Sequence, residues 1–211
     1  LNWTVANDLV VKTYYARKIG KSAQEMVVVS VMPCTAKKFE AQRPEMNASG
    51  VRDVDYVLTT RELARMIREG GIDFAALPDE AMDAPLGLSS GAADIFANTG
   101  GVMEAALRTA YEIVTGKSLP GDNLHVTALA GLEGVKEAAL TIAGTKPAWA
   151  FLEGVELKVA VAHGLGNARR LLEHIKAKGP TYHFVEVMTC PGGCIGGGGQ
   201  PRFTDDAVRL K

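Results

Sequence analysis

The chain has 211 residues, of which 47% are hydrophobic and 22% are charged, a composition typical of globular proteins that bury a sizeable core. Its 23 Lys and Arg residues against 24 Asp and Glu residues give a net charge of -1, and neither sign gathers into a block suited to a nucleic acid or an anionic membrane. No apolar run approaches the roughly 18 residues of a membrane span, and the first residues lack the order of a signal peptide. We therefore expect neither nucleic acid nor lipid as a partner.

Apolar periodicity divides the chain into two kinds of segment. Helical spacing of apolar residues predicts helices over 4–19, 61–71, 102–116 and 167–179. Short β-branched runs predict strands over 26–32, 54–60, 124–131, 156–164 and 182–188, the first of them buried on both faces in a parallel sheet. Strands and helices alternate on each side of residues 77–101, whose Pro, Gly, Ser and Ala content is typical of a binding loop or disorder. These patterns predict an α/β fold with two lobes of mainly parallel sheet flanked by helices, approximately residues 1–120 and 121–211.

The three cysteines are too few and too far apart for a disulfide framework. Cys34 directly follows the strand predicted over 26–32, whereas Cys190 and Cys194 lie near the other end of the chain. An odd number of cysteines fits a reducing or oxygen-poor compartment. Taken alone, a cysteine after a strand is more often a small buried hydrophobic residue than a ligand.

The segment TCPGGCIGGGGQP, residues 189–201, packs six glycines around two cysteines. Proline and glycine between Cys190 and Cys194 oppose a helix, so we expect a loop. Glycines let backbone N–H groups approach a bulky anionic guest, and thiolates beside many amides suit an iron–sulfur cluster. Other interpretations stay open: a redox couple, a zinc site completed by His163 or His183, or a flexible glycine turn. The passage AHGLGNARR around His163 is also compatible with a phosphate-binding turn.

Three stretches carry a resemblance to a known family. MPCTAKKFE (32–40) and MTCPGGCIGGGGQP (188–201) resemble the second and third cluster-binding signatures of the iron-only (FeFe) hydrogenases. LGLSSGAADIFANTGGVMEAALR (86–108) resembles the segment between them, and the match runs from about Lys12 to the C-terminus. The resemblance implies an oxidoreductase that reversibly reduces protons to H2, with its cluster in a cleft between two lobes.

The resemblance also implies a cofactor and its ligands. The cofactor of that family is a 4Fe–4S cubane joined through one thiolate to a two-iron subcluster with carbonyl, cyanide and dithiolate ligands. By position, Cys34 and Cys190 would ligate the cubane, and Cys194 would ligate it and bridge to the two-iron unit. Lys37 matches a lysine that donates a hydrogen bond to a cyanide ligand, which is an anion buried in a low dielectric. Glu40 matches a carboxylate used in proton movement or in holding the lysine, although a solvated surface glutamate is the plain alternative.

The remaining candidate cofactor-binding residues are apolar or lie at a helix start. By resemblance, Met32, Met188 and Phe96 would pack around the two-iron unit, although core filling explains each of them equally well. Thr99 is a candidate N-cap of the helix over 102–116. Together with Gly100 and Gly101 it would offer amides and a positive helix end to an anionic guest.

The chain departs from the family in one respect that bears on activity. The family's Thr-Ser-Cys signature, which supplies the fourth cubane ligand and a proton-carrying cysteine, is absent from these residues, and the opening LNWTVANDLV does not resemble the family. Ala97 stands where the family generally has glycine, one methyl group larger. We expect an internal fragment or one half of a split enzyme, inactive alone until the upstream segment or a second subunit supplies the fourth cysteine.

The family also implies partners and leaves other classes of function open. Expected partners are a ferredoxin-like electron donor or additional iron–sulfur domains, and hydrogenase maturation proteins, in the cytoplasm of an anaerobic organism. The alternative function is a non-catalytic hydrogenase-like iron–sulfur protein of cluster assembly or sensing. Lys37 with Glu40 favours a hydrogenase, because a protein that holds only cubanes has no cyanide for the lysine to meet. A zinc-stabilised α/β binding module is the third candidate.

Overall fold

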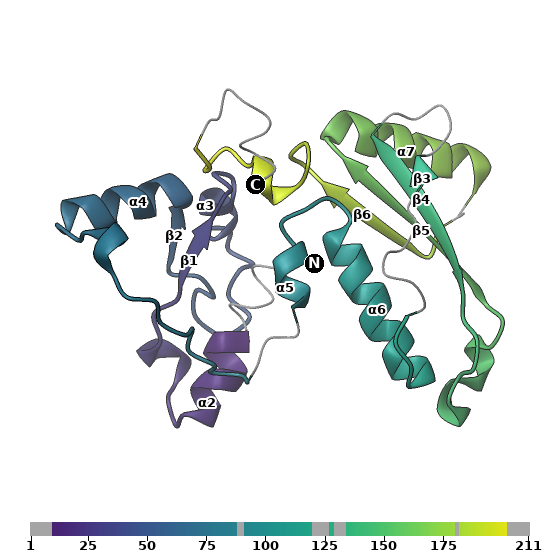
Figure 1. The fold of residues 1–211 in the computed structure, drawn as a ribbon, viewed down its shortest axis with the longest axis horizontal. Coiled ribbons are helices and arrows are strands. Elements are labelled where there is room, and N and C mark those ends of the chain that lie inside the picture. Colours follow the sequence, from purple (N-terminus) through teal and green to yellow (C-terminus); the bar gives the residue numbers. More distant parts are fainter. Residues whose placement is uncertain (1–9, 88–90, 120–126, 129–133, 180–181, 202–211) are drawn as a thin grey trace. The chain divides into compact units, whose positions relative to one another are not determined.

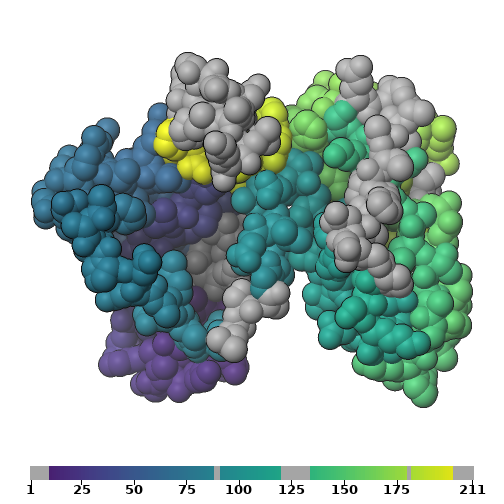
Figure 2. Space-filling model, in the orientation of Figure 1, coloured from purple at the N-terminus to yellow at the C-terminus, as the bar shows by residue number. Residues whose placement is uncertain are grey.

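The computed structural model describes residues 10–87, 91–119, 127–128, 134–179 and 182–201. The chain divides into unit 1, Leu1–Ser89 with Gly197–Lys211, and unit 2, Ser90–Gly196 (Figure 1). The division does not fall at the expected boundary near residue 120, because the long helix α6 (Gly101–Thr115) packs on the sheet of unit 2. The last described residues, 197–201, belong to unit 1, and Figure 2 draws the C-terminal described residues in yellow.

Unit 1 is built on two parallel strands, β1 (Val29–Met32) and β2 (Tyr56–Thr59), which pair from Val29 opposite Tyr56 to Met32 opposite Thr59. Its helices are η1 (Val11–Tyr15), α2 (Ala16–Lys18), η2 (Ala23–Glu25), α3 (Lys37–Glu40), α4 (Thr60–Glu69) and η3 (Phe74–Ala76). The strands predicted over 26–32 and 54–60 and the helix predicted over 61–71 are thus confirmed with shorter bounds. The helix predicted over 4–19 is confirmed from residue 10, and its first residues lie outside the described part.

The first strand is buried on one side only, which corrects the expectation of burial on both faces. Ser30 is 5% exposed, whereas Val29 and Val31 are 49% and 41% exposed. Side chains alternate between the two faces of a strand, so one face of β1 packs inward and the other faces outward. Among the described residues this sheet has two strands, too few to enclose β1.

A buried ion pair fixes the start of unit 1. Lys12 is 3% exposed, and its Nζ donates to a carboxylate oxygen of Asp55 at 2.9 Å and to the carbonyl of Arg52. The same carboxylate accepts the N–H of Val28 at 2.7 Å, just before β1. Burial raises the pKa of Asp55, but the hydrogen bonds from Lys12 and Val28 outweigh it, so the pKa lies below its ordinary value. A charge this deeply buried is tolerated only with a partner.

Unit 2 contains a four-stranded sheet of order β3-β4-β5-β6. The strands are β3 (Thr127–Ala128), β4 (Val135–Thr141), β5 (Glu156–His163) and β6 (Phe184–Met188). The helices are α5 (Ala92–Ile95), α6, η4 (Pro147–Leu152), α7 (Leu165–Lys178) and η5 (Cys194–Gly196). β5 and β6 pair in parallel, whereas β4, a strand not predicted from the sequence, runs antiparallel to β5. The strand predicted over 124–131 lies mostly outside the described residues.

Alternation along β5 places a core on each face of this sheet. Val159 and Val161 pack with Met103 and Leu107 of α6. The intervening residues Ala160 and Ala162 pack on the other face with Val135 and with Leu171 of α7. Because both faces are covered by helices, β5 carries four consecutive buried residues. The α/β class with parallel strands flanked by helices is confirmed.

The helices bear on the question of a membrane partner. Across the described ranges, no helix is both long enough and apolar enough to cross a bilayer.

Candidate metal centre

Cys190 and Cys194 lie in a tight loop at the carboxyl end of β6. The N–H of Gly193 donates to the carbonyl of Cys190 at 3.0 Å, and the N–H of Gly196 donates to the carbonyl of Gly193 at 3.1 Å. Gly192 and Gly193 adopt φ values of 79° and 100°, a region that favours glycine. The prediction of a loop rather than a helix between the two cysteines is therefore confirmed.

The backbone of residues 97–99 forms the seat of this loop. The N–H of Thr99 donates to the carbonyl of Gly192, and the N–H of Ile195 donates to the carbonyl of Ala97, each at 3.1 Å. A Cβ atom added to Gly193 would lie 2.5 Å from the Ala97 oxygen and 2.7 Å from the Thr99 nitrogen. The two backbone segments therefore approach so closely that only glycine fits. Ala97 contributes its carbonyl group to this seat.

A buried glutamate, which sequence reasoning missed, caps the helix beside the loop. Glu186 of β6 is 6% exposed, and its two carboxylate oxygens accept the N–H groups of Gly100 at 2.6 Å and Met103 at 2.7 Å. Negative charge at a helix N-terminus is stabilising. The signal in the sequence is a lone carboxylate inside the apolar strand FVEVM.

The structure corrects one expectation for the helix start. The N-cap of α6 is Gly100, with φ of 90°, rather than Thr99. The N–H groups of Thr99, Gly100 and Gly101 donate to Gly192, Glu186 and Asn98, so each of the three already has a protein acceptor. What Thr99 offers instead is its hydroxyl, a buried side-chain oxygen without a hydrogen-bond partner among the described residues.

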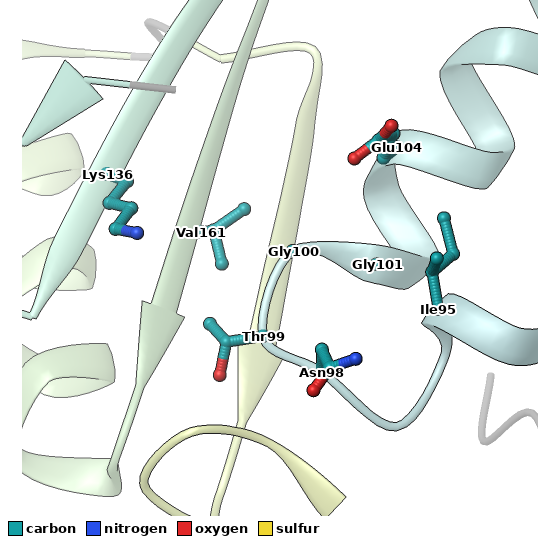
Figure 3. A pocket seen from close by; sticks show the side chains of 8 residues that line it. All are labelled: Ile95, Asn98, Thr99, Gly100, Gly101, Glu104, Lys136 and Val161. Atoms are coloured by element: carbon teal, nitrogen blue, oxygen red, sulfur yellow. The ribbon is translucent and has the colours of Figure 1, made fainter. Parts of the chain in front are cut away.

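A small pocket of about 190 Å³ lies beside the same helix start (Figure 3). Its walls come from Ile95, Asn98, Thr99, Gly100, Gly101, Glu104, Lys136 and Val161. Glu104 accepts hydrogen bonds from Arg108 at 2.7 and 2.9 Å, one turn along α6. The pocket thus has a largely apolar lining, with a paired carboxylate on one wall and the ammonium of Lys136 on another.

Cys34 lies in unit 1, after the end of β1 and before α3, just as Cys190 follows the end of β6 in unit 2. Lys37 and Glu40 form an ion pair across one turn of α3, with Nζ 3.5 Å from Oε2. Their side chains are 13% and 20% exposed. Glu40 is therefore half-buried and paired with Lys37 rather than fully solvated.

The neighbouring lysine anchors α3 to the rest of unit 1. Lys38 Nζ donates to the carbonyl of Val57 in β2 at 3.0 Å and lies 2.8 Å from a carboxylate oxygen of Glu62. Glu62 also completes a capping box with Thr59 at the start of α4. The hydrogen bonds from Lys38 and Thr59 lower the pKa of Glu62 to about 2. This network fixes the short helix that carries Lys37.

The apolar candidates end strands or a helix, and all are half-buried. Met32 and Met188 are the last residues of β1 and β6, and Phe96 follows α5. None of the three cysteines forms a disulfide.

The structure does not assemble the zinc alternative. Nδ1 of His183 accepts the N–H of Lys158 at 3.0 Å. Over the described ranges, no three His, Cys, Asp or Glu side chains are grouped as ligands of one metal ion, a result that applies to the zinc alternative and to the three cysteines alike. At the passage proposed for phosphate, the side chain of Asn167 donates to the carbonyl of His163, one turn before it in the chain.

The fold and the cysteine segments define an α/β protein with cysteines after the ends of parallel strands. The family described as the iron only hydrogenase large subunit, C-terminal domain, matches residues 8–198. The chain belongs to this family.

Known relatives support the assignment. The chain is 53% identical, over 96% of its length, to the NADP-reducing hydrogenase subunit HndD of Solidesulfovibrio fructosivorans, and 49% identical, over 92%, to the periplasmic Fe hydrogenase large subunit of Nitratidesulfovibrio vulgaris. It spans only 32% and 44% of these two relatives. Because one of them is named a periplasmic enzyme, family membership does not fix the compartment.

A solved structure and a more distant relative complete the comparison. A variant of the FeFe-hydrogenase HydA1 from Chlamydomonas reinhardtii superposes with a TM-score of 0.80 at 41% identity, covering 98% of this chain and 56% of that one. The cytosolic iron-sulfur assembly component 3 of Mus musculus is 31% identical over 93% of this chain, which spans 40% of it.

Proposed function

We propose that this chain provides the part of a hydrogenase catalytic domain in which Cys34, Cys190 and Cys194 ligate a 4Fe–4S cubane. In this proposal Cys194 also bridges to a two-iron subcluster that bears carbonyl, cyanide and dithiolate ligands. The donor set fits, because three thiols outside disulfides are the soft ligands that iron–sulfur groups take. When bound, this cofactor supplies the reversible reduction of protons to H2, and the protein supplies ligation, hydrogen bonds and exclusion of water.

The observation that carries the proposal is the Lys37–Glu40 pair. A lysine 13% exposed, three residues after a candidate ligand, has lost much of its hydration and needs anionic acceptors. Glu40 holds the side chain, and in this proposal the ammonium also donates an N–H to a cyanide ligand. The pairing at 3.5 Å supports the role of Glu40 in holding the lysine and leaves its role in proton movement as part of the proposal.

The surrounding residues have lesser proposed roles. Met32, Met188 and Phe96 are proposed to exclude water around the two-iron unit, as half-buried residues next to the cysteine segments. Thr99 is proposed to donate its hydroxyl, which has no hydrogen-bond partner among the described residues, toward the cofactor. Gly100 and Gly101 are proposed to shape the helix start that supports the seat of the loop.

The proposal requires partners, because the 211 residues contain only three cysteines. A fourth ligand must come from residues outside them, in the same chain or in a second subunit, and maturation proteins must insert the two-iron unit. Electrons are proposed to arrive from a ferredoxin-like donor or from additional iron–sulfur domains. The 211-residue chain alone is therefore expected to evolve no hydrogen after maturation, and measurable evolution would contradict this requirement.

A second candidate function is non-catalytic iron–sulfur assembly or sensing. The observation in its favour is the similarity to cytosolic iron-sulfur assembly component 3. It predicts a cubane without a two-iron unit, and it gives the buried Lys37 no cyanide to meet.

The deciding experiment is anaerobic reconstitution, with iron and acid-labile sulfide counted per chain and the EPR spectrum of the reduced sample recorded. About four irons with a cubane signal are expected, as the proposed cluster requires. Single Cys34→Ser, Cys190→Ser and Cys194→Ser variants should each bind less iron. Lack of bound iron in the unsubstituted chain would overturn the proposal.

Infrared spectra after maturation separate the two candidates. Carbonyl and cyanide bands are expected with the hydrogenase function and not with the assembly function. Cys194→Ala should remove the bands while some cubane iron stays, and bands that survive would show that the bridging assignment is wrong. Lys37→Met should shift the cyanide bands. The control variant Thr35→Val, at an exposed neighbouring residue, should leave them in place.

A further inference from the structure

Residues 198–199, which follow the loop of Cys190 and Cys194, lie against the backbone next to Cys34. The N–H of Gly199 donates to the carbonyl of Pro33 at 2.7 Å, and the carbonyl of Gly199 accepts the N–H of Arg61 at 3.3 Å. Pro33 has no N–H, so its carbonyl is its only backbone hydrogen-bonding group. Gly199 therefore binds the residue that directly precedes Cys34. All these residues belong to unit 1.

Gly199 must be a glycine for reasons of space. A Cβ atom there would lie 2.9 Å from the carbonyl carbon of Pro33 and 2.9 Å from Cβ of Thr59. At Gly198 the nearest atom would be Oγ1 of Thr35, at 3.4 Å, which is ordinary contact. Neither glycine has a positive φ, so alanine is strained by crowding at one position and unstrained at the other.

Arg61 holds the same segment from the other side. Its Nη2 donates to the carbonyl of Gly198 at 2.8 Å. Arg61 is the second residue of α4, where the helix dipole disfavours a cation. The contact with Gly198, rather than helix stability, therefore accounts for an arginine at this position.

We propose that Arg61 and Gly199 are positioning residues for Cys34. They fix the Pro33–Cys34 turn through the backbone of residues 198–199 and so set the direction in which the thiol points. Gly199 follows Cys194 shortly in the sequence, so the same contact ties the end of one cysteine segment to the start of another. The inference rests on the proposed function, in which Cys34 is a cluster ligand.

The test compares thiol reactivity in protein prepared without iron. Iodoacetamide alkylation of each cysteine is followed by peptide mass spectrometry in Gly199→Ala and Gly198→Ala, and in Arg61→Ala, Arg61→Lys and Arg65→Ala. Gly199→Ala and Arg61→Ala should speed the alkylation of Cys34 roughly five- to tenfold, the effect of one lost hydrogen bond on a local opening. Cys190 and Cys194 should keep their rates. Arg61→Lys should restore most of the slow rate, and the two controls should match the unsubstituted chain.

Two results would overturn the inference. One is that Cys34 is alkylated at the same rate in Gly199→Ala and Gly198→Ala while Arg61→Ala leaves that rate unchanged. The other is an equal rise at all three cysteines, which would mean general loosening rather than positioning. Should Gly199→Ala fail to fold, the arginine variants decide alone. Iron per chain and the EPR signal are then measured on the same set: absence of iron in the unsubstituted chain would defeat the proposed function, while the alkylation rates still report on the position of Cys34.

Discussion

The two units present a cysteine in the same way but hold it by different means. In unit 1, β1 ends at Met32 and Cys34 follows after one residue, and in unit 2, β6 ends at Met188 and Cys190 follows after one residue. Both strands pair in parallel with a neighbour. The carboxyl ends of parallel strands are a common place for ligand sites, because loops there converge from several strands.

The difference lies in what supports each strand end. The sheet of unit 2 is covered on both faces, and its cysteine loop is held by backbone contacts with residues 97–99 and by the capping of α6. The sheet of unit 1 exposes Val29 and Val31, and its support comes largely from ion pairs around Lys12 and Lys38. The cysteine loop of unit 2 should therefore be most sensitive to added atoms, and the sheet of unit 1 to lost charges.

The largest effect is expected at the buried pair of unit 1. Asp55→Asn leaves the ammonium of Lys12 buried without its counter-charge, and unfolding by urea should show a loss of about 3 kcal/mol. The exposed pair Lys21–Glu25 offers a matched control, since its side chains are 52% and 51% exposed and Glu25→Gln should change little. If the two variants were equally stable, charge pairing would not be what supports unit 1.

An added methyl group tests the opposite expectation for unit 2. Alanine at Gly192 or Gly193 must adopt a positive φ, which costs about 1–2 kcal/mol at either position. Only at Gly193 would its Cβ atom also overlap the seat of the loop, whereas at Gly192 nothing lies within 4 Å. Gly193→Ala should therefore lose iron binding far more than Gly192→Ala. Equal losses would show that backbone conformation, not close approach, limits this loop.

A lost charge in unit 2 should have an effect of intermediate size. Glu186→Gln keeps the shape of the side chain but can accept with only one oxygen, so one N–H of Gly100 or Met103 loses its acceptor. The expected loss is about 1–3 kcal/mol of stability, measured by urea unfolding. Glu104→Gln, on the half-buried surface of the same helix, should cost less. Equal losses of stability in the two variants would show that capping by Glu186 does not support the cysteine loop.

The sequence predicted most of the elements that carry the site and few of the contacts that hold it. Strands such as β1 and β6 and helices such as α6 have strong periodic patterns, whereas β4, with the sequence VKEAALT, lacks a β-branched run and was missed. Burial of β1 was overestimated, because an apolar run does not tell how many neighbours its sheet has. The capping by Glu186 and the contact of Gly199 with Pro33 join residues far apart in the chain, and no local pattern encodes such pairs.

The smallest predicted effect is a pH dependence in unit 1. The folded pKa of Glu62 is about 2, below the ordinary value of 4.5, because its carboxylate accepts hydrogen bonds from Lys38 and Thr59. A carboxyl group with a depressed pKa adds stability that is fully present above about pH 4.5 and is lost as the pH falls toward 2. Protein prepared without iron should therefore lose more stability between pH 5 and pH 3, in urea titrations, than its Glu62→Gln variant. Lys38→Met removes the largest cause of the lowered pKa. It should therefore also reduce the loss of stability between pH 5 and pH 3. If stability changed with pH in the same way in all three proteins, the network around α3 would not depend on the charge of Glu62. The support of unit 1 by charge pairs, in contrast to the backbone-held loop of unit 2, would then depend on Lys12 alone.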